Sequence, residues 1–156
     1  MTPPRLAEPA GIEDLLLFRM SKVIALGGSL VTRICEGRFG ITRREWTVLA
    51  ILAREAAMHW SDVRVRCEID EARLSRAISS LVAKGLAQKS SLANRQVLVS
   101  LTEQGRQLHA EMFPIAREIN AELLRALDPE MTESLDRTLV KLHGRGELLV
   151  ARTTDP

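Results

Sequence analysis

The sequence predicts a mainly α-helical protein with one small β-hairpin. Apolar residues recur at steps of three and four over most of the chain, which is the period of an amphipathic helix, and the period changes to two only after Gly85. The chain has 156 residues, of which 46% are apolar and 27% are charged. This length suits one domain with its own core, and the composition excludes a disordered tail, a fibre and a disulfide scaffold. We expect one domain over residues 11–150, with a flexible arm before it (1–10) and a frayed tail after it (151–156).

The first half of the predicted domain consists of helices with recognisable ends. Apolar side chains describe a long helix over residues 12–38, and glycines follow it. Thr42 then precedes a second helix as its N-cap, with Glu45 at the third helical position in a capping box. This second helix is expected to end near Ala57, and a short segment over residues 61–67 follows it.

A third helix and a hairpin come next. Asp70 is placed to cap a helix over residues 71–84, and Gly85 is its natural C-terminal stop. Residues 86–89 and 96–101 are strand candidates because the second run is β-branched and partly alternating. A polar turn joins the two runs, so that they form a hairpin.

Two more helices complete the predicted chain. A helical run over residues 102–127 has an apolar seam in which Pro114 is a kink or a frayed point. Asp128 and Pro129 break this run, and a last helix covers residues 131–145.

The order of these elements is that of a winged helix-turn-helix. Two short helices, a tight turn, a third helix that ends at a glycine and a two-stranded hairpin cover residues 42–102. Long helices over residues 12–38 and 103–145 flank this unit. In this fold the helix after the turn fits the DNA major groove, and the hairpin reaches neighbouring phosphates or the minor groove.

The predicted groove-facing helix separates apolar from polar residues. Leu74, Ile78 and Leu81 share one face of the helix and are expected to be buried. Four polar residues are left to project outward as candidate DNA contacts: Arg73, Ser75, Arg76 and Ser79. Arg73 and Arg76 are neighbours on the helix surface, where they can share base and phosphate contacts.

The distribution of charge favours the same region. Residues 60–106 contain eight Lys or Arg against five Asp or Glu (+3), whereas residues 1–59 carry +2 and residues 107–156 carry −3. Arginine makes up 18 of the 22 basic residues, and its planar fork suits phosphates and guanine edges. Codon usage can produce the same preference, so the composition by itself does not decide the partner.

Several short motifs resemble one known family. They are the run from Ile41 to Leu49, Ile69-Asp70 with Leu74-Ser75-Arg76, the run from Leu81 to Leu86, Arg95, and the junction from Val99 to Gly105. In this combination the chain resembles the MarR (multiple-antibiotic-resistance regulator) family of bacterial transcription factors over about residues 12–142. The resemblance implies a homodimer whose first and last helices intertwine as dimerisation helices, with two winged lobes on a pseudo-palindromic operator.

The resemblance also implies that the hairpin contacts DNA through Arg95 and the adjacent Asn94. The family's wing usually has an acidic residue two places before this arginine, where this chain has Ala93. Arg95 is therefore expected to keep its role on DNA without that carboxylate partner. Glu68 is a second departure, because it stands where a small turn residue is usual.

Members of the family often bind small aromatic or phenolic acids between the dimer region and the DNA lobe. By this resemblance Phe18, Arg19 and Trp46 are candidate ligand-pocket residues. An aromatic residue on an apolar helix face is more often core, and Arg19 fits a surface salt bridge equally well. Both interpretations stay open at this point.

Other kinds of site have little support in the sequence. Cys35 and Cys67 have no tyrosine partners of the kind that the family's peroxide sensors use, so they are interpreted as structural. His59, His109 and His143 are isolated, without metal-ligand spacing. No metal site and no cofactor are predicted.

The remaining patterns narrow the function class. The chain has no GxSxG, HExxH or phosphate-binding glycine loop, which argues against an enzyme. The most apolar stretch, residues 15–31, is interrupted by Arg19 and Lys22, and no signal-peptide core precedes it, so we expect a cytoplasmic protein without a membrane span. The prediction is a homodimeric, ligand-responsive transcriptional regulator that binds double-stranded DNA, more a repressor than an activator. The alternatives are a winged helix that docks to protein, or a redox- or metal-responsive regulator without an organic ligand.

Overall fold

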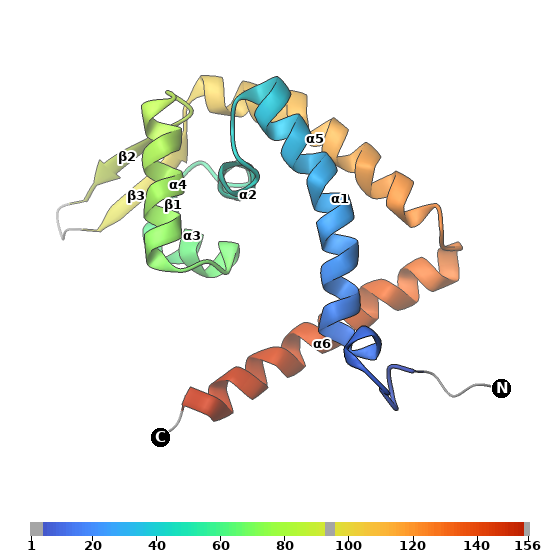
Figure 1. The fold of residues 1–156 in the computed structure, drawn as a ribbon. Coiled ribbons are helices and arrows are strands. Elements are labelled where there is room, and N and C mark those ends of the chain that lie inside the picture. Colours follow the sequence, from blue (N-terminus) through green and yellow to red (C-terminus); the bar gives the residue numbers. More distant parts are fainter. Residues whose placement is uncertain (1–4, 93–95, 155–156) are drawn as a thin grey trace. The chain divides into compact units, whose positions relative to one another are not determined.

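The fold is known from a computed structural model, which describes residues 5–92 and 96–154. The chain divides into two compact units, residues 1–117 and 118–156. The first unit contains the winged helix-turn-helix, and the second contains the end of one long helix and all of the next (Figure 1). The mainly helical fold with a small antiparallel sheet confirms the predicted fold class.

The first long helix is α1 (Leu16–Phe39), and a short 3₁₀ turn, η1 (Ile12–Asp14), precedes it. The predicted helix over residues 12–38 is thus interrupted at Leu15, whose backbone is extended. Helix α1 ends at Gly40, which has a left-handed backbone (φ +64°) that glycine adopts at little cost.

Helix α2 (Arg43–Leu52) begins with the predicted capping box. The Glu45 backbone N–H donates to Thr42 Oγ1 (3.2 Å), and the Thr42 backbone N–H donates to the Glu45 carboxylate (2.6 Å). The expectation that this helix continues to about Ala57 is wrong. The chain must leave the helix early because strand β1 (Met58–His59), which the sequence did not predict, pairs with the hairpin.

Helices α3 (Trp60–Cys67) and α4 (Glu71–Ala83) form the helix-turn-helix. Between them Glu68 has a left-handed backbone (φ +50°), which explains why a small residue is usual at this turn. The carboxylate of Asp70 caps α4 as predicted, accepting a hydrogen bond from the Arg73 backbone N–H (2.8 Å).

Strands β2 (Ala87–Ser91) and β3 (Val97–Leu101) are the predicted hairpin, in a sheet of order β1-β3-β2. Figure 1 shows the hairpin extending away from the helices beside α4. The base of the hairpin is closed by Thr102, whose hydroxyl donates to the Gly85 carbonyl (2.6 Å) and whose N–H donates to the Leu86 carbonyl (3.1 Å). The end of α4, both ends of the hairpin and the start of the next helix therefore meet at one point.

Helix α5 (Glu103–Leu124) runs through Pro114 without a break, and helix α6 (Pro129–Thr154) starts after Asp128, which accepts a hydrogen bond from the Met131 N–H (2.7 Å). Helix α6 extends well past its predicted end at residue 145, so the expected frayed tail is helical as far as the structure describes it. Its two glycines weaken a helix by about 1 kcal/mol each, which a long helix tolerates.

The hydrophobic core lies in the first unit. Its fully buried side chains come from α1 to α4, the sheet, Ile41 between α1 and α2, and Met112 on α5, whereas no described side chain of α6 is buried. Gly105 on α5 packs so closely on the Leu86 carbonyl that a Cβ at this glycine would overlap it. No helix within the described ranges is long and apolar enough to cross a membrane.

Candidate nucleic-acid interface

Helix α4, which has the position of the recognition helix in a helix-turn-helix, presents a polar face opposite its buried one. Leu74, Ile78 and Leu81 have no solvent exposure, as predicted. The four predicted polar residues lie away from the core, three of them exposed and Ser75 partly exposed: Arg73, Ser75, Arg76 and Ser79. This face has no catalytic pair and offers two guanidinium groups and two hydroxyls. Their contacts with DNA stay a prediction.

The two arginines of this face differ in their partners. Arg73 Nε lies 3.0 Å from the carboxylate of Asp70, the residue that caps the same helix. Arg76 has no ion pair with any residue in the described part of the chain. Arg76 therefore carries the unneutralised charge of the face.

The hairpin formed by β2 and β3 is the wing of this fold. Its predicted DNA contacts, Asn94 and Arg95, lie outside the described residues, as does Ala93. The residues on either side of this segment pair with each other, because the Leu92 N–H donates to the Gln96 carbonyl (2.8 Å). The roles of Asn94 and Arg95 stay predictions from the sequence.

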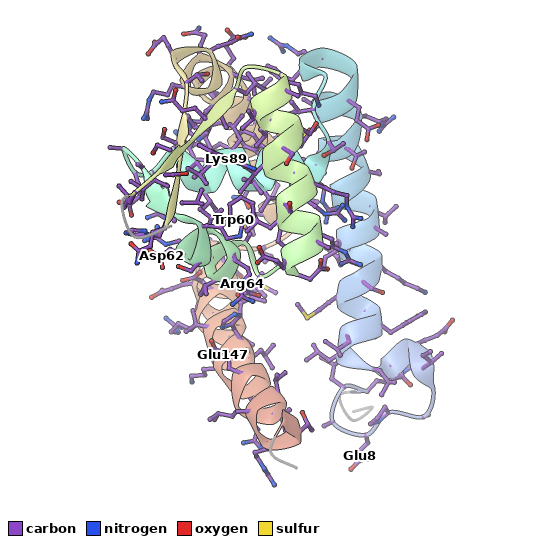
Figure 2. The ribbon with its side chains drawn as sticks, turned by 90° about the vertical axis from the view of Figure 1, so that its left-hand side faces the viewer. Glu8, Trp60, Asp62, Arg64, Lys89 and Glu147 are labelled. Atoms are coloured by element: carbon purple, nitrogen blue, oxygen red, sulfur yellow. The ribbon has the colours of Figure 1, made fainter. Side chains whose placement is uncertain are left out.

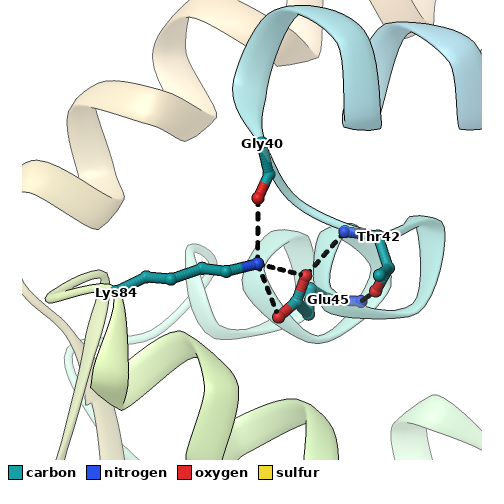
Figure 3. Close-up of polar contacts among 4 residues, drawn as sticks. All are labelled: Gly40, Thr42, Glu45 and Lys84. Atoms are coloured by element: carbon teal, nitrogen blue, oxygen red, sulfur yellow. Dashed lines mark hydrogen bonds and ion pairs between the residues drawn. The ribbon is translucent and has the colours of Figure 1, made fainter.

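An ion pair fixes the C-terminal end of the recognition helix (Figure 3). Lys84 Nζ contacts both carboxylate oxygens of Glu45 (2.9 and 3.0 Å) and donates to the Gly40 carbonyl (2.9 Å). The Glu45 residue is only 3% exposed. Burial raises the pKa of Glu45, but hydrogen bonds from Ser80, Thr42 and Lys84, with the charge of Lys84, outweigh it and lower the pKa. The carboxylate is thus charged at neutral pH, and Lys84 links the end of α4 to α2 through Glu45 and to the end of α1 through Gly40.

A hollow of about 470 Å³ lies at the start of α2. Two arginines, one glutamate and three threonines give the hollow polar character, and it reaches the turn before α4. The residues that line it are Thr32, Glu36, Thr42, Arg43, Arg44, Thr47, Cys67 and Ile69. The Arg43 guanidinium lies against Gly28 of α1, where a Cβ would overlap it. The sequence analysis missed this site, although the Arg43-Arg44 pair next to a helix cap was a visible signal.

The three predicted ligand-pocket residues make separate contacts. Phe18 lies under the ammonium group of Lys22 (4.8 Å to the ring centroid), and Arg19 Nε donates to the Glu13 carbonyl (3.3 Å). Trp46 is 9% exposed and belongs to the core, in agreement with the core interpretation of this residue. A role of these residues in ligand binding stays a prediction.

An aromatic stack connects α2 to α5. The ring of His109 is stacked between Trp46 (centroids 5.7 Å apart) and Phe113 (5.2 Å). Burial lowers the pKa of His109, which keeps the imidazole neutral at pH 7. The neutral ring serves as part of the packing between these helices.

Both cysteines are buried in this unit. Burial is the largest influence on both thiols and raises the pKa of Cys35 and of Cys67 to about 11. Neither thiol is therefore a thiolate at neutral pH, which fits the structural interpretation. Within residues 5–92 and 96–154, no group of three His, Cys, Asp or Glu side chains is arranged to hold a metal ion.

Residues 39–95 match the profile of the MarR family. The match covers little more than a third of the chain and makes its central segment similar to the MarR family. No curated protein sequence matches this chain. The family that matches consists of transcriptional regulators and not of enzymes.

Solved structures of MarR regulators resemble it over most of the chain. A MarR-family transcriptional regulator from Silicibacter pomeroyi is 23% identical, covers 88% of this chain and 92% of its own, and has a TM-score of 0.74. Staphylococcus aureus MepR, solved as a DNA complex, is 18% identical with a TM-score of 0.78, over 84% of this chain and 98% of its own. Bordetella bronchiseptica BpsR, whose DNA binding is regulated by 6-hydroxynicotinic acid, is 26% identical with a TM-score of 0.68, over 80% and 98%.

Proposed function

We propose that this chain is a homodimeric transcriptional repressor of the MarR type that binds a pseudo-palindromic operator and is released by a small carboxylate ligand. The observation that carries the proposal is the exposed polar face of α4, whose opposite face is fully buried. A recognition helix of this kind enters the major groove with the residues of its first turns. The structure of MepR with DNA supports this use of the fold.

The roles of two arginines follow from where they stand. Arg76 is exposed and unpaired with described residues, so its guanidinium is available for a guanine edge in the major groove. Arg95, in the wing, is proposed to contact phosphates or the minor groove. Arg73 shares its charge with Asp70 and is expected to contribute less.

A homodimer is supported by apolar side chains that this chain leaves in water. Leu17 and Leu26 on α1 are 79% and 75% exposed, and Val140 on α6 is 68% exposed. Apolar surface spread along two long helices favours a second copy, and a twofold dimer presents two recognition helices to a palindrome. Sedimentation of the purified chain measures this directly, and a monomer would contradict it.

The ligand is proposed to occupy the hollow at the start of α2. Arg43 and Arg44 suit a carboxylate, which arginine binds through two parallel hydrogen bonds. The hollow also includes Ile69, which directly precedes the cap of α4, so an occupant can bias the position of that helix. The effector of BpsR, a pyridine carboxylic acid, has the chemistry that this site suits.

Binding to DNA is tested first. The wild-type chain is used to select duplexes from a random library, and affinity is measured by fluorescence anisotropy at fixed salt with a scrambled duplex as control. A specific regulator prefers the selected duplex by about a thousandfold or more. Equal weak binding to both duplexes would contradict the proposal and favour a winged helix that docks to protein.

Two variants then separate the proposed roles. Arg76→Ala is expected to reduce discrimination between duplexes, whereas Arg95→Ala is expected to weaken binding to all duplexes and to lower the salt slope by about one. Arg125→Ala, an exposed arginine paired with Glu122 at the end of α5, is the matched control and is expected to bind like the wild type. Wild-type affinity and selectivity in both test variants would show that these roles are wrong.

The ligand site is tested with nicotinic and salicylic acids as probes. Release of the wild type from its duplex by either acid, and loss of this response in Arg43→Gln with DNA affinity kept, would support the hollow. An unchanged response in Arg43→Gln and Arg44→Gln would place the ligand elsewhere, and Phe18, Arg19 and Trp46 would be the next candidates.

A further inference from the structure

Trp60, the first residue of α3, contacts both the recognition helix and the wing. Its indole N–H donates to Glu71 Oε1 on α4 (2.7 Å), and Lys89 Nζ on β2 lies 5.1 Å from the centroid of its ring. Arg64, one turn along α3, lies with its Nε 3.8 Å from Glu71 Oε2. Figure 2 shows Trp60 between Lys89 and Arg64 on one side of the protein. One half-buried side chain therefore joins three elements of the fold.

The outer part of the wing has few other anchors of this kind. Along β2, Ala87 is buried, but every residue from Gln88 to Ser91 is exposed. Pairing with β3 fixes one edge of β2, with Lys89 opposite Val99, but β1 pairs with β3 only, so β2 is an edge strand whose outer side has no strand partner within the described residues. The contact between Lys89 and Trp60 ties the exposed stretch of β2 to the helix-turn-helix.

The same tryptophan restrains an acidic side chain on the recognition helix. Glu71 is the first residue of α4, and its side chain is 64% exposed. A free carboxylate there would repel DNA phosphates beside Arg73 and Arg76. Trp60 and Arg64 each contact one of its oxygens from α3, which holds the carboxylate on the α3 side.

We propose that Trp60 is a positioning residue that locks the wing and the recognition helix into one DNA-binding unit. The inference rests on the proposed function, because its benefit appears when both parts contact one duplex. With the lock in place, the wing needs no further ordering when α4 enters the groove, so less conformational entropy is lost on binding. Without it, the wing must be ordered by the DNA itself.

The lock is tested by a double-substitution cycle at Trp60 and Lys89. Hydrogen exchange of the free protein reports on the wing, and anisotropy on the selected duplex, over a range of salt, reports on binding. We expect Trp60→Ala to speed exchange in β2 and β3, with exchange in α4 unchanged, and to weaken binding about tenfold. Lys89→Met is expected to act in the same direction. Because both substitutions remove the same contact, the double variant is expected to have wing exchange and DNA affinity close to those of Trp60→Ala alone.

Lys22→Met is the matched control. It removes the same charge and the same kind of contact, because Lys22 Nζ lies 4.8 Å from the Phe18 centroid on α1, outside the winged helix. Wing exchange and affinity are expected to stay at wild-type values in this variant. A loss equal to that of Lys89→Met would mean that general charge and not the lock is responsible, which overturns the proposal.

The remaining outcomes separate the lock from the proposed function. A wild-type chain that selects no duplex contradicts the proposed function, and wing exchange in Trp60→Ala then decides on the lock alone. A wild-type chain that binds its duplex, with wing exchange and affinity both unchanged in Trp60→Ala, overturns the lock. If Trp60→Ala does not fold, Lys89→Met takes its place under the same criteria, because it removes the contact with the Trp60 ring and leaves the tryptophan in place.

Discussion

Substitution of Lys84 by methionine tests how strongly the buried carboxylate of Glu45 depends on its ion pair. Removal of one partner of a fully buried pair costs about 3–5 kcal/mol. The Lys84 side chain is 36% exposed, and the Thr42 N–H still donates to Glu45 in the variant. Water and this hydrogen bond lower the expected loss to about 1–3 kcal/mol of unfolding free energy at pH 7. At about 2–4 °C per kcal/mol for a chain of this size, thermal unfolding at fixed protomer concentration resolves the change.

The pH dependence of the same variant provides a second readout. Because its partners lower the pKa of Glu45, the ion pair stabilises the fold above the ordinary carboxyl value of 4.5 and is lost as the pH falls through the lower folded value. The stability gap between wild type and Lys84→Met should therefore narrow below about pH 4.5. Arg137→Met removes an exposed pair with Glu133 on α6 and is the control, with an expected cost of less than about 1 kcal/mol. The reasoning would be refuted by a Lys84→Met chain as stable as this control, or by a stability difference from the wild type that does not change with pH.

Two further predictions concern packing in the first unit. Gly105→Ala should destabilise the fold by about 1–3 kcal/mol in urea unfolding, because its Cβ overlaps a backbone carbonyl, whereas Gly37→Ala, which meets nothing within 4 Å on α1, should stabilise it by up to about 1 kcal/mol. Equal effects of both would argue against the close approach. His109, whose pKa burial lowers, should make the wild type less stable as the pH falls below 6.5, since the unfolded chain takes up that proton first. His109→Phe should remove this loss of unfolding free energy between pH 6.5 and the pKa of His109 in the folded chain. An unchanged dependence of stability on pH would contradict the burial of this imidazole.

Features with a local cause could be predicted from the sequence. The capping box at Thr42 and Glu45, the cap at Asp70 and the stop at Gly85 each depend on residues within a few positions of one another. The buried face of α4 follows from its period, and with it the outward direction of Arg76. For the same reason, the order of the elements was sufficient to indicate the fold class.

Features made by distant residues could not be predicted in this way. Strand β1 has two residues and therefore no period of its own, and it exists because β3 offers it a partner. The contact of Lys84 with Glu45 spans 39 positions, and that of Trp60 with Lys89 crosses from α3 to the wing. The hollow at Arg43 needs residues of α1, α2 and the turn before α4 together.

The closed base of the wing has a consequence for how this scaffold can be changed. Thr102 is bonded to both Gly85 and Leu86, so the two ends of the hairpin are joined independently of what the hairpin contains at its far end. We therefore expect that the length and charge of the segment between Leu92 and Gln96 can be changed without a shift of α4. Such an arrangement lets a lineage, or an engineer, retune the contacts of the wing without redesigning the recognition helix. Grafts of longer or more basic tips onto this chain are expected to fold on the same core.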